Sequence, residues 1–268
     1  MKNSIRFTFL TVIIFCISSL LKAQDNLNNR LEQSPRHHEW VEIPSGDKTL
    51  KAFVVYPEVS EKAKTVIVIH ENRGLTDWVR SFADQLAEKG FIVLAPDMLS
   101  DFSEEYSQTS AFPSSDDARN AIYKLDSRLV TTYLNNSFNY LKKLAAGTGE
   151  VAVVGFCWGG SQSFRYATQN PDLSEALVFY GTGPKEAIEY AEIEAPVYGF
   201  YGGNDQRVNA TIEASKNAME EYQHIYDYEI YEGAGHAYMR SGDDPSGPED
   251  NIKARNDSWE RLVRILEK

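Results

Sequence analysis

The chain has 268 residues, and 39 Asp and Glu residues against 27 Lys and Arg residues give it a formal net charge of -12 at pH 7. Because so acidic a surface repels phosphate backbones, we expect no nucleic-acid partner. The length suits a single α/β domain with one large core.

The first 23 residues have the composition of a secretory signal peptide. Lys2 and Arg6 give a positive start, an apolar run occupies 7–21, and Ala23 is a small residue suited to cleavage. The run is short for a bilayer-spanning helix, which needs about 20 apolar residues. We therefore predict cleavage after Ala23, a secreted or periplasmic protein, and no membrane contact after cleavage.

Residues 24–37 are polar and form a predicted tether, so the single folded domain is expected to span 38–268. Of the two cysteines, Cys16 lies in the predicted signal peptide and Cys157 lies in the domain. No intramolecular disulfide can then form in the mature chain. An unpaired cysteine in an oxidising compartment is expected either to be buried or to have a function.

Short apolar runs rich in β-branched and aromatic residues alternate with helical patterns along the domain. This alternation is typical of a mainly parallel sheet with helices on both faces, here of eight strands. The predicted strands are 40–43, 50–56, 65–69, 91–95, 151–155, 176–180, 197–201 and 226–231. Helical spacing of apolar residues occurs at 78–86, 121–138 and 259–266.

The segment 100–118 shows no clean period and mixes acidic, hydroxyl and aromatic side chains. It is interpreted either as a lid or rim over a substrate cleft or as an ordinary surface excursion.

Cys157 lies where the predicted strand 151–155 turns into a predicted helix at 161–168. Gly155 and Gly159 flank it in the pattern of the G-x-S-x-G nucleophile elbow, with cysteine in the place of serine. A thiol at a helix N-terminus is expected to ionise more easily than free cysteine. The alternative is a buried, inert cysteine between glycines.

Two later residues complete a candidate triad. Asp205 follows the predicted strand 197–201 through a glycine-rich turn, and His236 follows the strand 226–231 through another. The order nucleophile, acid, histidine is the one that α/β-hydrolases use. We therefore predict His236 as the base, oriented by Asp205.

The other histidines are weaker candidates for the base. His37, His38 and His224 are expected to be solvated, and His70 ends the predicted strand 65–69 near the site. No histidine pair or cysteine pair has the spacing of a closed zinc site, and no dinucleotide fingerprint is complete. We expect neither a metal nor a cofactor.

Four ordered motifs resemble the dienelactone hydrolase family: HENRGL at 70–75, APD at 95–97, GFCWGG at 155–160 and GHAY at 235–238. The resemblance runs from about Leu50 to near the end of the chain. It implies an α/β-hydrolase fold and cleavage of a lactone or carboxylic ester through a cysteine acyl-enzyme.

The resemblance also implies roles for individual residues. It makes Cys157, Asp205 and His236 the triad, and it has Glu71 contact the resting thiol and help it to ionise. The oxyanion hole would come from the backbone N–H groups of Trp158 and Asn72.

Arg240 corresponds to one of the family's arginines that bind a substrate carboxylate. A second arginine has no counterpart after the APD motif, where Met98 to Asp101 stand instead. Repulsion from Asp101 would disfavour a dianionic lactone.

Three alternatives stay open. The chain could be a general extracytoplasmic carboxylesterase of polymer or glycan acyl groups, a non-catalytic binding protein on the same fold, or a thiol redox protein. We expect a monomer that takes a small ester or lactone.

Overall fold

The computed structural model describes residues 30–268, so the predicted signal peptide and the first part of the predicted tether lie outside the described residues. The chain divides into two units, 1–35 and 36–268. In the first, residues 30–32 are helical, and every strand belongs to the second. Within 30–268, no helix combines the length and apolar character that a membrane crossing requires.

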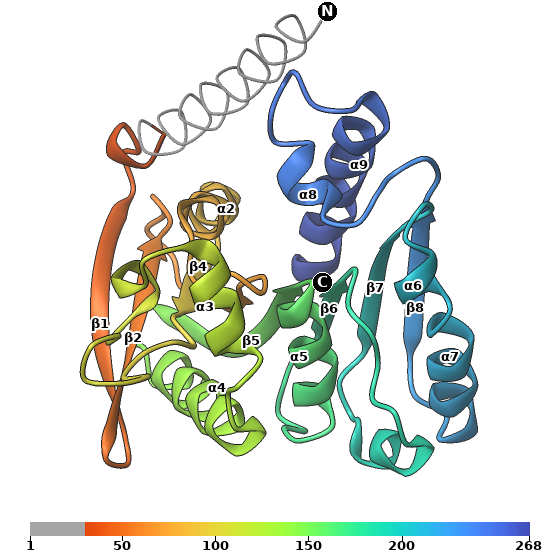
Figure 1. Cartoon of the computed structure of the whole chain (residues 1–268), viewed down its shortest axis with the longest axis horizontal. Coiled ribbons are helices and arrows are strands. Elements are labelled where there is room, and N and C mark those ends of the chain that lie inside the picture. The colour runs from red at the N-terminus through yellow and green to blue at the C-terminus, as the bar shows by residue number, and fades with distance from the viewer. Residues whose placement is uncertain (1–29) are drawn as a thin grey trace, which may run out of the picture. The chain divides into compact units, whose positions relative to one another are not determined.

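The second unit is built on one eight-stranded sheet in the order β1-β2-β4-β3-β5-β6-β7-β8 (Figure 1). Its strands are β1 His37–Ser45, β2 Lys48–Tyr56, β3 Ala63–Ile69, β4 Ile92–Pro96, β5 Gly147–Phe156, β6 Ala176–Phe179, β7 Val197–Gly202 and β8 Tyr226–Tyr231. β2 is antiparallel to both β1 and β4, and all other neighbours are parallel. The predicted fold class, a mainly parallel eight-stranded α/β-hydrolase sheet, is confirmed.

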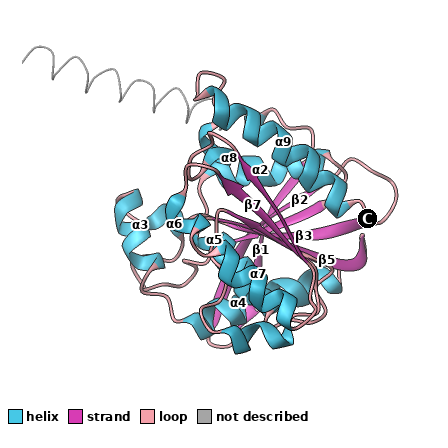
Figure 2. Cartoon of the chain, turned by 90° about the vertical axis from the view of Figure 1, so that its right-hand side faces the viewer, coloured by secondary structure: helices cyan, strands magenta, loops and turns pink. Residues whose placement is uncertain are grey.

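Helices cover both faces of the sheet (Figure 2). α2 and α9 lie on one face, and α4, α5 and α7 lie on the other. The helices are α2 Asp77–Glu88, α3 Ser115–Ile122, α4 Ser127–Lys142, α5 Trp158–Ala167, α6 Gln206–Asn209, α7 Ile212–Glu221, α8 Tyr238–Ser241 and α9 Glu249–Leu266, with short 3-10 turns at Thr109–Ala111 and Ala187–Glu192.

The loose helical stripe predicted at 121–138 is two helices, α3 and α4. The break falls where the Asp126 carboxylate accepts a hydrogen bond from the Arg128 N–H at 2.8 Å and caps the start of α4. Asp is among the residues most favoured at this capping position, so a new helix begins there.

β1 begins three residues before its predicted start, because His37 and His38 pair with Tyr56 and Val55 of β2. The last residue of the predicted tether is therefore part of the sheet. The prediction that His38 is solvated was wrong. Its Nε2 lies 2.8 Å from a carboxylate oxygen of buried Asp84 in α2.

The centre of the sheet is held by a row of buried rings near its carboxyl edge. Phe156 at the end of β5 packs on Phe179 of β6 with ring centroids 4.9 Å apart, and Phe179 stacks on Phe200 of β7 at 4.2 Å. All three are fully buried. Because the rings fix the strand ends relative to one another, the loops that follow β5, β6 and β7 start from rigid positions.

Candidate active site

Cys157 occupies a strained turn between β5 and α5, with φ 55° and ψ -114°. The turn leaves no room for side chains at the flanking glycines. A Cβ at Gly155 would lie 1.9 Å from the Gly159 carbonyl oxygen, and one at Gly159 would lie 2.4 Å from that of His70. The two glycines that suggested the elbow are therefore required by its backbone.

The structure brings the three predicted triad side chains together. His236 Nε2 lies 3.1 Å from Cys157 Sγ, and His236 Nδ1 lies 2.5 Å from Asp205 Oδ2. Because a carboxylate can only accept, Nδ1 carries the proton and Nε2 is left to accept one from the thiol. This geometry is what a thiol nucleophile and its base require.

Hydrogen bonds from backbone N–H groups hold both Asp205 and the loop that carries His236 in place. Asp205 is the N-cap of α6, where its Oδ1 accepts the Val208 N–H at 3.4 Å, and it is 7% exposed. In the histidine loop, the Gly235 N–H donates to Asn251 Oδ1 of α9 at 2.9 Å. α9 thus helps to position His236 even though it is far from the elbow in sequence.

The resting thiol is harder to ionise than the sequence indicated. Burial, followed by the negative charge of Glu71, raises the pKa of Cys157 to about 11. The N–H groups of Trp158 and Asn72 and the charge of Arg207 lower it, but by less. The helix N-terminus therefore acts as predicted, and the prediction of an easily ionised thiol was wrong because burial and Glu71 outweigh it.

The N–H groups of the two predicted oxyanion donors, Trp158 and Asn72, each lower the pKa of the Cys157 thiol. Beyond the backbone, the Asn72 side chain donates to the Tyr123 hydroxyl at 3.0 Å. That contact ties the loop after β3 to the end of α3.

His70 supports this arrangement and is not available as a base. It is completely buried, its Nδ1 donates to the Glu71 carbonyl at 2.7 Å, and its Nε2 accepts the Met98 N–H at 3.2 Å. Its ring stacks on Trp158, with centroids 5.6 Å apart. Burial lowers the pKa of His70, so it stays neutral, stacked on Trp158 and bonded to Glu71, the residue before Asn72.

Glu71 and Arg240 form an ion pair with each other. Arg240 Nε donates to Glu71 Oε2 at 2.7 Å, while Glu71 Oε1 is buried and has no hydrogen-bond partner. In the resting protein this pair takes the place of the contact between Glu71 and the thiol that the family resemblance implied. The Arg240 side chain remains 47% exposed, so a substrate anion can still reach it.

Tyr180 is a residue of the site that the sequence did not single out. It follows β6 with φ 40°, and its ring meets the His236 ring edge-on at a centroid distance of 5.1 Å. Its hydroxyl is buried and has no partner. The position itself was a usable signal, because the residue after β6 lies at the same sheet edge as the residues after β5 and β7.

The segment 100–118 is hydrogen-bonded to the loop after β3, residues 70–76, and is not free above it. Thr109 Oγ1 donates to Asp97 Oδ1 at 2.6 Å and accepts the Leu75 N–H at 2.9 Å. Asp101 accepts the Thr49 N–H at 2.6 Å through its side chain. The Asp101 carboxylate therefore accepts a hydrogen bond from a backbone N–H at the start of β2.

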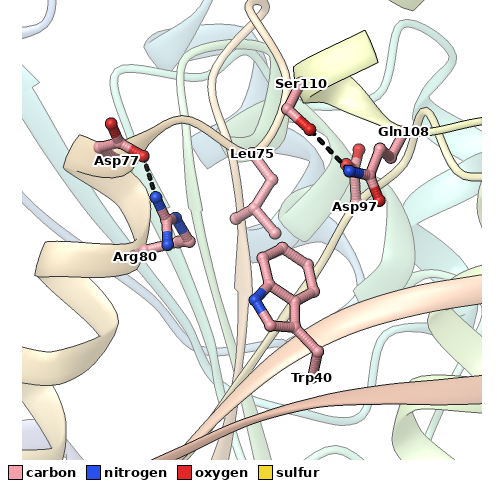
Figure 3. A pocket seen from close by; sticks show the side chains of 7 residues that line it. All are labelled: Trp40, Leu75, Asp77, Arg80, Asp97, Gln108 and Ser110. Atoms are coloured by element: carbon pink, nitrogen blue, oxygen red, sulfur yellow. Dashed lines mark hydrogen bonds and ion pairs between the residues drawn. The ribbon is translucent and has the colours of Figure 1, made fainter. Parts of the chain in front are cut away.

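A pocket of about 390 Å³ lies beside Leu75 and Ser110, and no triad residue lines it (Figure 3). The half-exposed ring of Trp40 lies against Leu75, with Asp77 and Arg80 to one side. Its polar walls are already engaged: Asp77 pairs with Arg80, and Asp97 accepts from Thr109. The pocket is lined by Trp40, Leu75, Asp77, Arg80, Asp97, Gln108 and Ser110.

The comparisons with known proteins agree with this geometry. The model of the dienelactone hydrolase family matches residues 50–268. A "Putative carboxymethylenebutenolidase" of Yersinia pestis is 27% identical over 234 residues, which cover 82% of this chain and 84% of that protein. A "Probable 2-oxo-3-(5-oxofuran-2-ylidene)propanoate lactonase" of Bradyrhizobium sp is 26% identical over 214 residues, or 75% of this chain and 83% of that protein.

Among solved structures, the crystal structure of a "Putative Dienelactone Hydrolase" from Klebsiella pneumoniae subsp. pneumoniae superimposes with a TM-score of 0.75. The two chains are 22% identical, and the match covers 87% of this chain and 99% of the other. At that identity the likeness supports the fold and leaves the chemistry to the site itself.

Proposed function

This chain belongs to the dienelactone hydrolase family, as its four motifs predicted, and on that premise we propose that it cleaves a lactone or carboxylic ester through an acyl-enzyme on Cys157. Family membership makes it a dienelactone hydrolase-like hydrolase. The observation that carries the cysteine mechanism is the chain of contacts from Cys157 Sγ through His236 to Asp205, at 3.1 Å and 2.5 Å.

In the first half of the reaction, His236 Nε2 takes the thiol proton and the thiolate attacks the substrate carbonyl. The N–H groups of Trp158 and Asn72 stabilise the oxygen that becomes negative. His236 then gives its proton to the departing alkoxide, and a thioester to Cys157 results.

In the second half, His236 removes a proton from water, which attacks the thioester and releases the acid. Asp205 keeps the imidazole in the required tautomer and stabilises the imidazolium that forms in both halves. Arg240 is the proposed contact for a carboxylate of the substrate, which would compete with Glu71 for the guanidinium.

The substrate class follows from the site and from one relative. The name of the Bradyrhizobium protein describes it as a lactonase of an unsaturated furanone acid. A small unsaturated lactone with one carboxylate would suit a partly buried thiol with a single arginine beside it. Simple aryl esters are the second group of substrates to test.

The protein is further proposed to be exported. Residues 1–23 carry the charge and apolar pattern of a signal peptide, and the domain that follows has one cysteine and no disulfide. The mature protein is proposed to act alone, without metal or cofactor, in a periplasmic or extracellular space.

The test is hydrolysis of p-nitrophenyl acetate and of a simple unsaturated lactone by the wild-type protein and its Cys157→Ala variant. Part of the wild-type protein is first treated with iodoacetamide, and the labelled residue is mapped by mass spectrometry. Loss of hydrolysis in step with alkylation of Cys157 supports the mechanism. Substantial turnover by a folded Cys157→Ala variant rules out the thiol, and no turnover of either substrate favours a binding protein on the same fold.

A further inference from the structure

Two buried polar atoms near the thiol lack hydrogen-bond partners: Glu71 Oε1 and the Tyr180 hydroxyl. Glu71 is 7% exposed and Tyr180 is 1% exposed, so water does not readily serve either. Buried polar groups are nearly always satisfied in folded proteins, and an unsatisfied pair within one site calls for an explanation. One is an acceptor and the other a donor, so each is the chemical complement of the other.

Tyr180 is held rigidly in its place. Its φ of 40° is unfavourable for a residue with a side chain, and its N–H donates to the Phe200 carbonyl at 2.8 Å. Its ring lies between His236 and Tyr238, at centroid distances of 5.1 Å and 5.4 Å. The hydroxyl therefore cannot move far to find a partner, and a partner has to come to it.

Glu71 is the group that can move. Arg240 is the one hydrogen-bond donor to the Glu71 carboxylate among the described residues, through Oε2, and the Arg240 side chain is itself half-exposed to solvent. The Cys157 N–H donates to the carbonyl of Phe179, the residue before Tyr180, at 3.0 Å, and the negative charge of Glu71 also acts on Tyr180, so the three groups lie in one buried region. Burial and Glu71 raise the pKa of Tyr180, so its hydroxyl keeps its proton and stays a donor.

We propose that Tyr180 is the second hydrogen-bond partner of Glu71, which donates to the carboxylate when Arg240 is drawn away by an anion. Tyr180 is then a positioning residue: its hydroxyl holds the Glu71 carboxylate in place beside the thiol while Arg240 is engaged elsewhere. The substrate anion that would draw Arg240 away belongs to the proposed function, whereas the hydrogen bond between Tyr180 and Glu71 does not depend on it.

The consequence can be measured at Cys157 without any substrate. The negative charge of Glu71 raises the pKa of the thiol, so loss of that charge makes Cys157 easier to alkylate. A buried carboxylate with no donor takes up a proton. Arg240→Met opens the ion pair and leaves Glu71 with Tyr180 alone, and adding Tyr180→Phe removes that last donor while keeping the ring.

The experiment measures the rate of iodoacetamide alkylation of Cys157 between pH 6 and pH 10 in the full chain, read by mass spectrometry. We expect Arg240→Met/Tyr180→Phe to be alkylated about tenfold faster at pH 8 than Arg240→Met, as a fall of one pKa unit implies. Tyr180→Phe alone should stay within about twofold of wild type, since Arg240 still holds Glu71. The other charge that acts on the thiol, that of Arg207, is the same in both proteins of the decisive pair.

Tyr238→Phe is the matched control, because its hydroxyl is equally buried but bonded to Ser258 Oγ at 2.7 Å. In the Arg240→Met background it should lower the Tm and leave alkylation unchanged. In the wild-type background, where Arg240 still holds Glu71, Tyr180→Phe should leave the Tm unchanged, since the hydroxyl it removes has no partner there.

Equal alkylation of Arg240→Met and Arg240→Met/Tyr180→Phe would overturn the proposal, as would an equal effect of Tyr180→Phe in both backgrounds. If Arg240→Met does not fold, Arg240→Gln serves the same comparison. A crystal structure of the arginine variant gives a direct reading, with the Tyr180 hydroxyl expected within about 3.2 Å of Glu71. Because no assay here uses ester hydrolysis, the hydrolase proposal and this one can fail separately.

Discussion

At the scale of single residues, the Cys157 thiol is protonated at rest. The same thiol has its base 3.1 Å away and N–H groups of Trp158 and Asn72 beside it, and yet its pKa stands near 11. Cys157 and His236 could be named from the elbow and from the order of the candidate triad, whereas Trp158 and Asn72 were implied by the family resemblance. The pKa could not, because it depends on burial and on Glu71, which lies 86 positions before Cys157 in another loop.

Glu71→Gln is expected to lower the pKa of the Cys157 thiol, because it removes the negative charge that raises it. Alkylation of Cys157 by iodoacetamide at pH 8 should then be several-fold faster than in wild type, since a larger fraction is thiolate. Glu232→Gln, at an exposed position, should leave the rate unchanged. A slower reaction in Glu71→Gln would contradict the sign of the effect.

At the scale of elements, the site depends on how closely β5, α5 and the loop after β3 approach one another. Gly159→Ala should be strongly destabilising, by about 3 kcal/mol, because its Cβ would lie 2.4 Å from backbone oxygens of Ile69 and His70. Gly235→Ala is the control, since its nearest neighbour, Asn251 Oδ1, would be 4.0 Å away. Chemical denaturation measures the free energy of unfolding of both variants. Equal values would show that the loop after β3 can shift to make room for the methyl group.

Thr109 links the segment after β4 to the loop after β3: its hydroxyl donates to the Asp97 carboxylate and accepts the Leu75 N–H. Thr109→Val leaves a buried N–H and a carboxylate without that partner, which costs about 1–3 kcal/mol. We expect lower stability and a reduced kcat, because the loop that carries Asn72 loses an anchor. Thr109→Ser keeps the hydroxyl and should behave nearly as wild type in the same denaturation and ester assays.

At the scale of the whole molecule, the sheet and its order of elements were predictable, while the side-chain partners in the site were not. Alternating apolar runs indicated eight strands, and β8 has the predicted bounds. The pair of Arg240 with Glu71 spans 169 positions, and nothing in either local sequence indicates it. Tyr180 was missed for a similar reason, since its apolar neighbours in β6 made it look like one more core residue.

Export is a prediction about the whole chain that can be checked directly. Expression of the full-length gene product in a Gram-negative host, followed by fractionation and N-terminal sequencing, should yield a periplasmic protein that starts at Gln24. The reason is the positively charged and apolar pattern of 1–23 with Ala23 at its end. An uncleaved protein in the cytoplasm would contradict the prediction, and deletion of 2–23 serves as the negative control.

The strand order has a consequence for how the chain folds as it is made. β1 and β2 are neighbours in sequence, but β3 pairs with β5, and Thr65 Oγ1 donates to the Glu150 carbonyl 85 positions later. The middle of the sheet therefore cannot close until the ribosome has passed β5, and such long-range parallel pairs form slowly. For a chain that we propose is exported, this late closure leaves time for it to be threaded through a translocation channel before it becomes compact.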